Sequence, residues 1–229
     1  RRNCLLLAIP TMYAIANTGV REHVGETYDR MMMKRPGDMH LTQMLERNTI
    51  PYGMRTMPTV LKYLTPLIYE ELLIDGRIIS PFHVRNRRFY RYKVSPFMRG
   101  AVIVSFRPRL KNTKLVRGWA RIEESTGRIL ETSFDGEYDL VRFHVTMTTG
   151  DEGVKTLMPA QCNLNTRFLF LGNDITAEYT TVLDLPKKLP DSVKIVNRRD
   201  TALLNLVRPI PTNSHEQYLY SRYYAARDA

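Results

Sequence analysis

Apolar and polar residues alternate along most of the stretch from Phe89 to Leu185, which short turn signals divide into segments of six to ten residues. Alternation with a period of two predicts β-strands with one buried face. Such short turns join antiparallel strands, whereas parallel strands need long crossovers. The stretch therefore predicts one strongly curved antiparallel meander. Its turn signals are Arg99-Gly100, Lys111-Asn112, Ser125-Thr126-Gly127, Asp135-Gly136, Thr149-Gly150-Asp151 and Gly172-Asn173-Asp174.

Four of the predicted strands show an apolar face opposite a mostly polar one, which is typical of an antiparallel sheet covered on one side. Two small residues on the apolar face, Gly118 and Ala120, indicate sharp curvature or the close approach of another group from the concave side. The apolar positions are Val102, Val104 and Phe106, then Val116, Gly118, Ala120 and Ile122, then Leu130, Thr132 and Phe134, and then Val141, Phe143, Val145 and Met147.

The region before the meander predicts shorter elements. Residues 1–20 suggest a short helix or an extended arm. Glu26–Met32 and Met39–Leu45 predict a hairpin, because Pro36-Gly37-Asp38 is a strong turn, although the composition of the second segment also suits a helix. Leucines from Met57-Pro58 onward recur at helical spacing. Pro66 must kink or end that helix, and a second helical piece follows over Leu67–Leu73.

Together these elements predict an α+β, mainly β, fold. We expect a strongly curved antiparallel sheet, a half-barrel, with short helices packed on its concave face. One domain would span residues 1–211, with the arm, hairpin and short helices in 1–84 and the meander in 85–186. A helical segment in 187–211 follows, with an amphipathic region over Asp200–Val207, and the polar tail 212–229 is expected to be exposed.

The net charge of +11 is the unusual total, and a basic surface favours anionic partners. Basic and aromatic residues alternate from Arg85 to Lys93, so that Arg91 and Lys93 share one face of a strand and Tyr90 and Tyr92 the other. Such a face can also be merely solvated. The chain carries no recognised nucleic-acid motif, so we expect no nucleic-acid partner. The candidates for an anion-binding surface are Arg87, Arg91, Lys93, Arg117 and Trp119.

The sequence carries no motif for catalysis, metal binding or cofactor binding. The five histidines lie in different segments, and neither a Gly-x-Ser-x-Gly elbow nor a phosphate-binding glycine loop is present. Acidic residues such as Asp135, Glu137 and Asp139 cluster at predicted turns. Cys4 and Cys162 either form one disulfide or are two buried thiols. We expect no enzyme activity, no metal and no cofactor.

A series of short motifs follows in order along the chain. The motifs are Arg1-Arg2-Asn3 through Tyr13, Gly25-Glu26-Thr27-Tyr28, Thr49-Ile50-Pro51, Ile79-Ser80-Pro81-Phe82, Arg88-Phe89-Tyr90-Arg91-Tyr92, Gly127-Arg128-Ile129 and Gly136-Glu137-Tyr138-Asp139. Together they resemble an uncharacterised family of Bacteroidetes cell-envelope proteins, and the resemblance covers the chain from Arg1 to about Pro211. Longer members of that family look like exported proteins with an additional carboxypeptidase-regulatory-like domain and an outer-membrane β-barrel, and this chain is similar only to their soluble portion.

The resemblance and the strand pattern imply a fold like that of the lipoprotein carriers LolA, LolB and RseB. By analogy, we expect an exported protein of the periplasm or cell envelope, peripheral to the outer membrane, that binds a lipid or lipidated ligand between sheet and helices. The alternative is a module that docks onto envelope proteins or anionic polymers through its basic face. The expected cavity residues, which could equally fill a closed core, are Leu61, Leu64, Leu67, Val102, Val104, Phe106, Ile122, Phe134, Phe143 and Val145.

Overall fold

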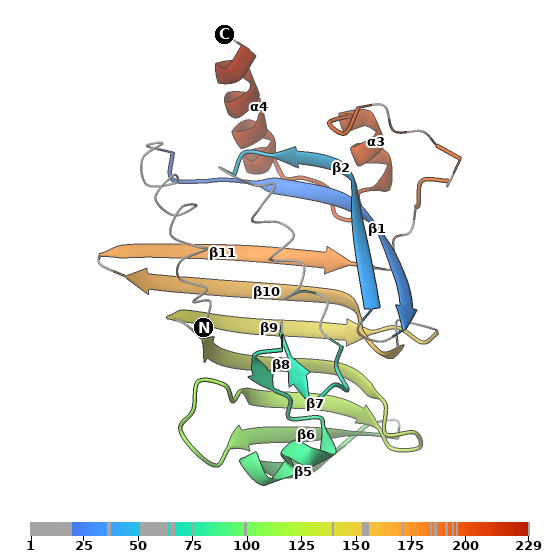
Figure 1. The fold of residues 1–229 in the computed structure, drawn as a ribbon, viewed down its shortest axis with the longest axis vertical. Helices are drawn as coiled ribbons and strands as arrows, with labels where there is room; N and C mark the ends of the chain where they lie inside the picture. The colour runs from blue at the N-terminus through green and yellow to red at the C-terminus, as the bar shows by residue number, and fades with distance from the viewer. Residues whose placement is uncertain are drawn as a thin grey trace. The chain divides into compact units, whose positions relative to one another are not determined.

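The computed structural model shows a mainly β protein with antiparallel sheets (Figure 1). The chain divides into two compact units, residues 1–58 with 185–229, and residues 59–184. The prediction of one domain over residues 1–211 stays a prediction. The structure describes residues 20–35, 38–50, 64, 67–74, 76–98, 100–138, 140–152, 156–170, 172–183, 185, 187–190, 192–193, 195 and 197–228.

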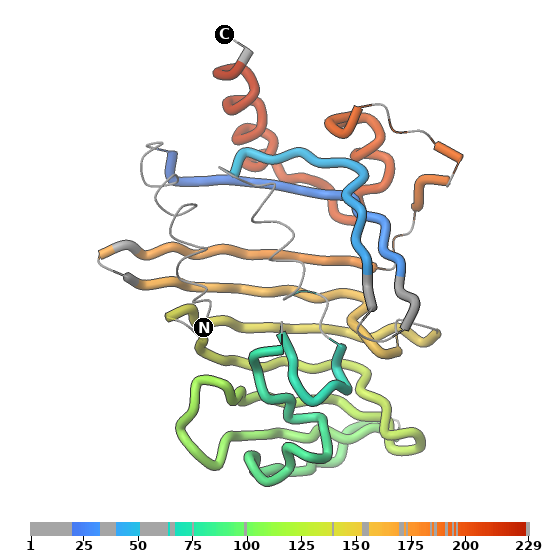
Figure 2. The backbone as a smooth tube through the Cα atoms, in the orientation of Figure 1, coloured from blue at the N-terminus to red at the C-terminus, as the bar shows by residue number. Residues whose placement is uncertain are grey.

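The unit of residues 59–184 is built on a seven-stranded sheet. Its strands follow one another in chain order from β5 to β11, each antiparallel to the next (Figure 2). The predicted antiparallel meander is confirmed, because short connections between consecutive strands produce this order. The strands are β5 (Tyr90–Phe97), β6 (Ala101–Pro108), β7 (Arg117–Glu123), β8 (Ile129–Tyr138), β9 (Val141–Thr149), β10 (Pro159–Phe170) and β11 (Asn173–Val182).

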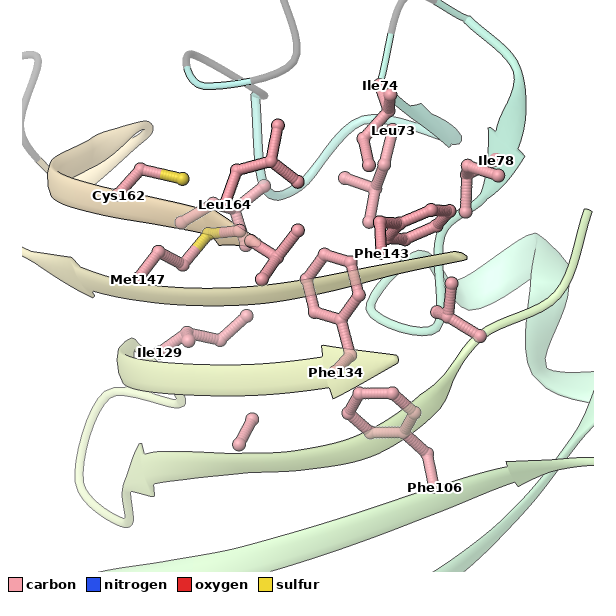
Figure 3. Close-up of a cluster of buried hydrophobic side chains, with 14 of the residues drawn as sticks. Leu73, Ile74, Ile78, Phe106, Ile129, Phe134, Phe143, Met147, Cys162 and Leu164 are labelled. Atoms are coloured by element: carbon pink, nitrogen blue, oxygen red, sulfur yellow. The ribbon is translucent and has the colours of Figure 1, made fainter. Parts of the chain in front are cut away.

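One face of this sheet carries the hydrophobic core. Across β6 to β10, the register places Phe106 opposite Gly118, which is followed by Phe134, Val145 and Leu164. The Phe106, Phe134 and Leu164 side chains lie in one buried cluster (Figure 3), to which Val145 also belongs. A Cβ atom at Gly118 would lie 2.0 Å from the carbonyl oxygen of Ser133, so only glycine allows β7 and β8 to approach this closely. Gly118 is therefore a site of close approach, but to the neighbouring strand β8 of the same sheet and not from the expected concave side.

A register shift in β8 changes which residue faces the core. Arg121 lies opposite Glu131 but Ile122 lies opposite Ile129, so Leu130 is an extra residue in the strand. A bulge of this kind reverses the alternation of faces beyond it. Ile129 is buried in the core and Leu130 is only half-buried. The placement of Leu130 in the core was wrong for this reason.

The expected turn at Asp135-Gly136 was also wrong, because both residues lie inside β8. Gly136 is paired with Phe143 on β9, and a Cβ atom at Gly136 would lie 2.2 Å from the Phe143 ring. The absence of a side chain at Gly136 therefore leaves the space on β8 that the Phe143 ring occupies. The chain turns at Leu140 instead, where a positive φ of 69° marks the connection to β9.

Short segments cover the core side of the sheet. Strands β3 (Leu72–Leu73) and β4 (Ile78–Ile79) pair with each other, so the helix predicted over Leu67–Leu73 was wrong. Leu64 is helical and buried, and the rest of the helix predicted from Met57 to Pro66 lies outside the described residues. The 3-10 helix η1 (Val84–Phe89) then leads directly into β5.

The unit of residues 1–58 and 185–229 contains the predicted hairpin. Strands β1 (Gly25–Arg35) and β2 (Asp38–Asn48) pair in antiparallel fashion. The predicted helical region is confirmed as α3 (Thr201–Val207), which begins where the Asp200 side chain accepts a hydrogen bond from the Leu203 N–H. The arm predicted over residues 1–20 lies almost entirely outside the described residues.

The polar tail predicted from residue 212 is instead the helix α4 (Ser214–Asp228). Tyr220 is fully buried; its hydroxyl donates a hydrogen bond to the Arg47 carbonyl oxygen, and the Arg47 guanidinium lies 4.0 Å from its ring centre. One anchored tyrosine thus holds the C-terminal helix in this unit. Among the described helices, none is long and apolar enough to cross a membrane.

Candidate functional site

The residues predicted to line a cavity mostly fill the hydrophobic core. Five of them belong to one cluster of buried side chains that pack against each other, and Ile122 packs against that cluster. Leu67, Val102 and Val104 are half-buried and lie outside it, while Leu61 lies outside the described residues. The structure therefore brings these residues together, but as packed core. The five clustered residues are Leu64, Phe106, Phe134, Phe143 and Val145.

An open pocket of about 500 Å³ lies elsewhere, between η1 and the β3–β4 pair. The buried Asn86 amide fixes this wall by donating hydrogen bonds to the carbonyl oxygens of Glu71 (2.7 Å) and Ser80 (3.0 Å). At the surface, the Arg85 guanidinium lies 3.3 Å from the Glu71 carboxylate. None of the predicted site residues line this pocket. Its lining residues are Glu71, Leu72, Ile79, Arg85, Asn86, Arg88 and Phe89.

The basic side chains are concentrated at the first strands of the sheet. Between Gly76 and Ile122 the chain carries thirteen Lys and Arg residues and no Asp or Glu. That stretch contributes more positive charge than the net +11 of the whole chain. The absence of acidic residues was visible in the sequence, but it was missed because only the basic and aromatic run from Arg85 to Lys93 was considered.

The strand register arranges several of these cations on the outer face of the sheet. Arg91 lies opposite Arg107, and Lys93 lies opposite Ser105, which in turn lies opposite Trp119. Because Phe106 pairs with Gly118, the next residues along each strand, Arg107 and Arg117, also lie side by side. We call the exposed group Arg87, Arg91, Lys93, Arg107 and Arg117 the basic sector.

The basic sector differs from the rest of the outer face in its ion pairing. Further along the sheet each cation has a carboxylate partner: Arg121 with Glu131 at 3.3 Å, Arg142 with Glu137 at 3.6 Å and Arg167 with Asp174 at 2.6 Å. None of the carboxylates in the described ranges forms a salt bridge with a member of the basic sector. Its positive charge is therefore available to a partner.

Of the predicted anion-binding residues, Arg91, Lys93, Arg117 and Trp119 come together on one face of the sheet. Arg87 lies on η1 at the start of β5, and its charge lowers the pKa of Tyr92 while burial raises it more. The structure adds Arg107 to this group, which sequence reasoning missed because a prediction of strands does not give their register.

A Ser–His–Asp row lies on the same outer face, in strands β8 and β9. The Asp135 carboxylate is 2.9 Å from Nδ1 of His144, and the Ser133 hydroxyl is 3.4 Å from Nε2. Sequence reasoning missed it, because His144 lies opposite Asp135 only through the register. Acyl transfer also needs donors for the oxyanion, and the backbone N–H groups of a central strand are bonded within the sheet. The two strands therefore offer no free backbone donor beside the row.

The remaining reactive groups are buried. Burial raises the pKa of the Cys162 thiol to about 12, so the thiol is protonated at neutral pH. Cys162 is a free cysteine, and Cys4 lies outside the described residues. Burial also raises the pKa of Tyr90, whose hydroxyl donates to the Ile79 carbonyl oxygen at 2.6 Å. Within the described ranges no group of three or more His, Cys, Asp or Glu side chains could hold a metal ion.

Comparison with known proteins gives one result. A family model matches residues 16–184, which include the β1–β2 hairpin and the whole seven-stranded sheet and leave out α3 and α4. No curated protein and no solved structure is detectably similar to the chain. Because the matched segment covers most of the chain, the chain belongs to DUF5686, a family of unknown function.

Proposed function

We propose that this chain is a non-enzymatic interaction module that binds an acidic partner protein through the basic sector. One observation carries the proposal: the cations of β5, β6 and the start of β7 have no ion-pair partner among the described residues, whereas Arg121, Arg142 and Arg167 further along the sheet are paired. Uncompensated like charges that are held side by side by strand pairing repel one another. A partner of opposite charge removes that repulsion.

The chemistry of the sector suits protein recognition. Arginine beside aromatic side chains is the combination that most often dominates the energy of protein interfaces. Here Trp119 lies on the same face as Lys93, and the Arg88 guanidinium lies 4.9 Å from the centre of the Phe89 ring. Charge complementarity of this kind speeds association and selects the partner more than it adds affinity.

The setting that we propose comes from the resemblance in the sequence. The module would belong to an exported protein of a Bacteroidetes cell envelope, located in the periplasm and peripheral to the outer membrane. The finer description of the fold, a strongly curved half-barrel with helices on its concave face as in LolA, LolB and RseB, is part of the same proposal. The acidic partner would then be another envelope protein.

Binding of a lipid or lipidated ligand is the second candidate. It is favoured by the uncovered apolar margin at β5 and β6, where Val102 and Val104 are half-buried and Val94 is 61% exposed. It ranks second because most residues predicted to line a cavity are packed in the core. The test below therefore includes lipid vesicles.

The first experiment measures binding of fluorescent poly-glutamate to the whole chain at several salt concentrations. The double variant R91Q/K93Q removes two charges from the basic sector, and R142Q/R167Q removes two charges from the same sheet face at β9 and β10. We expect the first variant to weaken binding about tenfold and the second less than twofold, because each exposed charge pair contributes up to about 1 kcal/mol.

Three outcomes would contradict the proposal. Equal losses in both double variants would show that binding follows net charge rather than the basic sector. Binding of vesicles containing anionic phosphatidylglycerol, with no binding of poly-glutamate, would favour the lipid alternative. Affinity that does not change with salt would also exclude an electrostatic interaction.

A further inference from the structure

Strand β5 is an edge of the seven-stranded sheet and pairs with β6 on one side only. An edge strand presents unpaired backbone N–H and C=O groups, to which another extended chain can add. Proteins usually protect such edges. Here the strand is eight residues long, with Pro96 near its end. An added strand can therefore bond only to those backbone groups of β5 that have no hydrogen-bond partner.

The hydrogen bond from the Arg109 N–H to the Phe89 carbonyl oxygen (2.8 Å) fixes the pattern. In antiparallel pairing, alternate residues bond to the neighbouring strand, so Arg91, Lys93 and Ser95 point their backbone groups toward β6. The backbone groups of Tyr92 and Val94 then point away from the sheet. In the part of the chain that the structure describes, neither residue has a backbone partner on that side.

The backbone groups that flank Tyr92 and Val94 on this edge are either already bonded or missing. The Tyr90 N–H donates to the Arg87 carbonyl oxygen, and the Tyr90 carbonyl oxygen accepts from Nε of Arg109 at 2.8 Å. At the other end Pro96 has no N–H to offer. The donors and acceptors of Tyr92 and Val94 are thus available for an added strand of about five residues.

The side chains of this segment divide into two kinds. Arg91 and Lys93 project on the outer face with Arg107 and Arg117, whereas Tyr92 and Val94 lie on the apolar face. The Tyr92 hydroxyl donates to the Pro81 carbonyl oxygen at 2.7 Å, which holds that side chain in place. An added strand meets cations on one face and apolar side chains on the other.

The positive charge of β5 decides which kind of extended segment can pair with this edge. A second copy of the chain, paired through its own β5, would bring Arg91 and Lys93 next to the same cations, which is destabilising. A strand with acidic residues on one face and apolar residues on the other satisfies both sides. This argument rests on the proposed function, because it takes the partner to be acidic.

We propose that β5 is the docking edge for an extended acidic segment of the partner protein, which adds to the sheet as an eighth strand beside Tyr92 and Val94. Acidic residues of the segment lie beside Arg91 and Lys93. Apolar residues alternate with them and lie beside Tyr92 and Val94. The backbone hydrogen bonds supply affinity, and the alternation supplies specificity.

The test uses a blocked hexapeptide of alternating glutamate and valine and two N-methylated forms of it. We take the segment to add antiparallel to β5, as each strand of this sheet does to its neighbour. Directly opposite residues of an antiparallel pair point their side chains to the same face, and the peptide valines opposite Tyr92 and Val94 then direct their N–H groups at β5. Methylation of the valine amides should abolish binding. Methylation of the glutamate amides, which point away, should leave binding within about threefold.

The matching variants are V94P and V94T. V94P removes an N–H that the sheet does not use, and V94T keeps that N–H with a side chain of similar shape. We expect V94P to weaken hexapeptide binding about tenfold and V94T less than threefold, with unchanged circular dichroism for both. Amide hydrogen exchange should slow at Tyr92 and Val94 when the hexapeptide binds.

Three results overturn the docking edge. Equal binding of the two methylated peptides, or equal binding by V94P and V94T, would show that charge alone holds the peptide, and the acidic partner of the basic sector would still stand. No binding of the hexapeptide, while poly-glutamate still binds and R91Q/K93Q still weakens it, would exclude strand addition in the same way. Failure of poly-glutamate as well would remove the proposed function itself.

Discussion

At the scale of single residues, two glycines on neighbouring strands decide how the core packs. Gly118 was predictable as a site of close approach, because it falls on the apolar face of an alternating strand. Gly136 was not, because an Asp-Gly pair is an equally good turn signal. Only the pairing with Phe143 on β9 shows that the glycine makes room for an aromatic ring.

Replacement of Gly136 with alanine should destabilise the protein by about 1–3 kcal/mol, because the added methyl group would overlap the Phe143 ring. Chemical denaturation of G136A, F143V and the double variant forms a double-mutant cycle. The cost of G136A should be smaller in the F143V background than in the original protein. An equal cost in both backgrounds would mean that contact with the ring is not the cause.

At the scale of elements, the strands that show a period of two were predictable from the sequence. The elements that depend on pairing between distant segments were not. The seven strands of the meander have alternation and turn signals, and they were found. The segment Leu67–Leu73 has apolar residues that suit a helix, but it is held by pairing of Leu72–Leu73 with Ile78–Ile79. The bulge at Leu130 likewise arises from the register of β7 on β8.

Helix α4 was missed because its sequence is polar and rich in tyrosine, with no clear apolar stripe. Its buried anchor, Tyr220, is met by Arg47 from β2. A second contact between the same parts of the chain is the hydrogen bond that the Asn48 N–H donates to the Tyr224 hydroxyl at 3.4 Å. Such anchoring depends on contacts between residues far apart in the sequence.

Tyr220 should therefore contribute much more to stability than its exposed neighbour on the same helix. We expect Y220A to lower the free energy of unfolding by about 3–5 kcal/mol, since the fully buried ring and its hydrogen bond are lost together. Y218A, at a position that is 58% exposed, should change it by less than about 0.5 kcal/mol. Thermal denaturation of the two variants tests this. Equal stability of Y220A and Y218A would mean that burial of Tyr220 does not anchor the helix.

At the scale of the whole chain, charge is the feature that connects the sequence to the proposed function. The stretch from Gly76 to Ile122 without acidic residues is readable from the sequence. The difference between paired and unpaired cations is not, because it depends on which residues the register sets side by side. Four of the five predicted anion-binding side chains, Arg87, Arg91, Lys93 and Arg117, belong to the basic sector, and their binding of an anion stays a prediction. Most residues predicted to line a lipid cavity are instead packed in the hydrophobic core.

The central claim is that an acidic partner binds at η1, β5 and β6. Amide hydrogen exchange, measured residue by residue on the whole chain with and without poly-glutamate, tests it most directly. The account predicts slower exchange within residues 84–109 and unchanged exchange within residues 141–182, where the outer-face cations already have carboxylate partners. Slower exchange confined to residues 141–182, or spread equally over both segments, would contradict it.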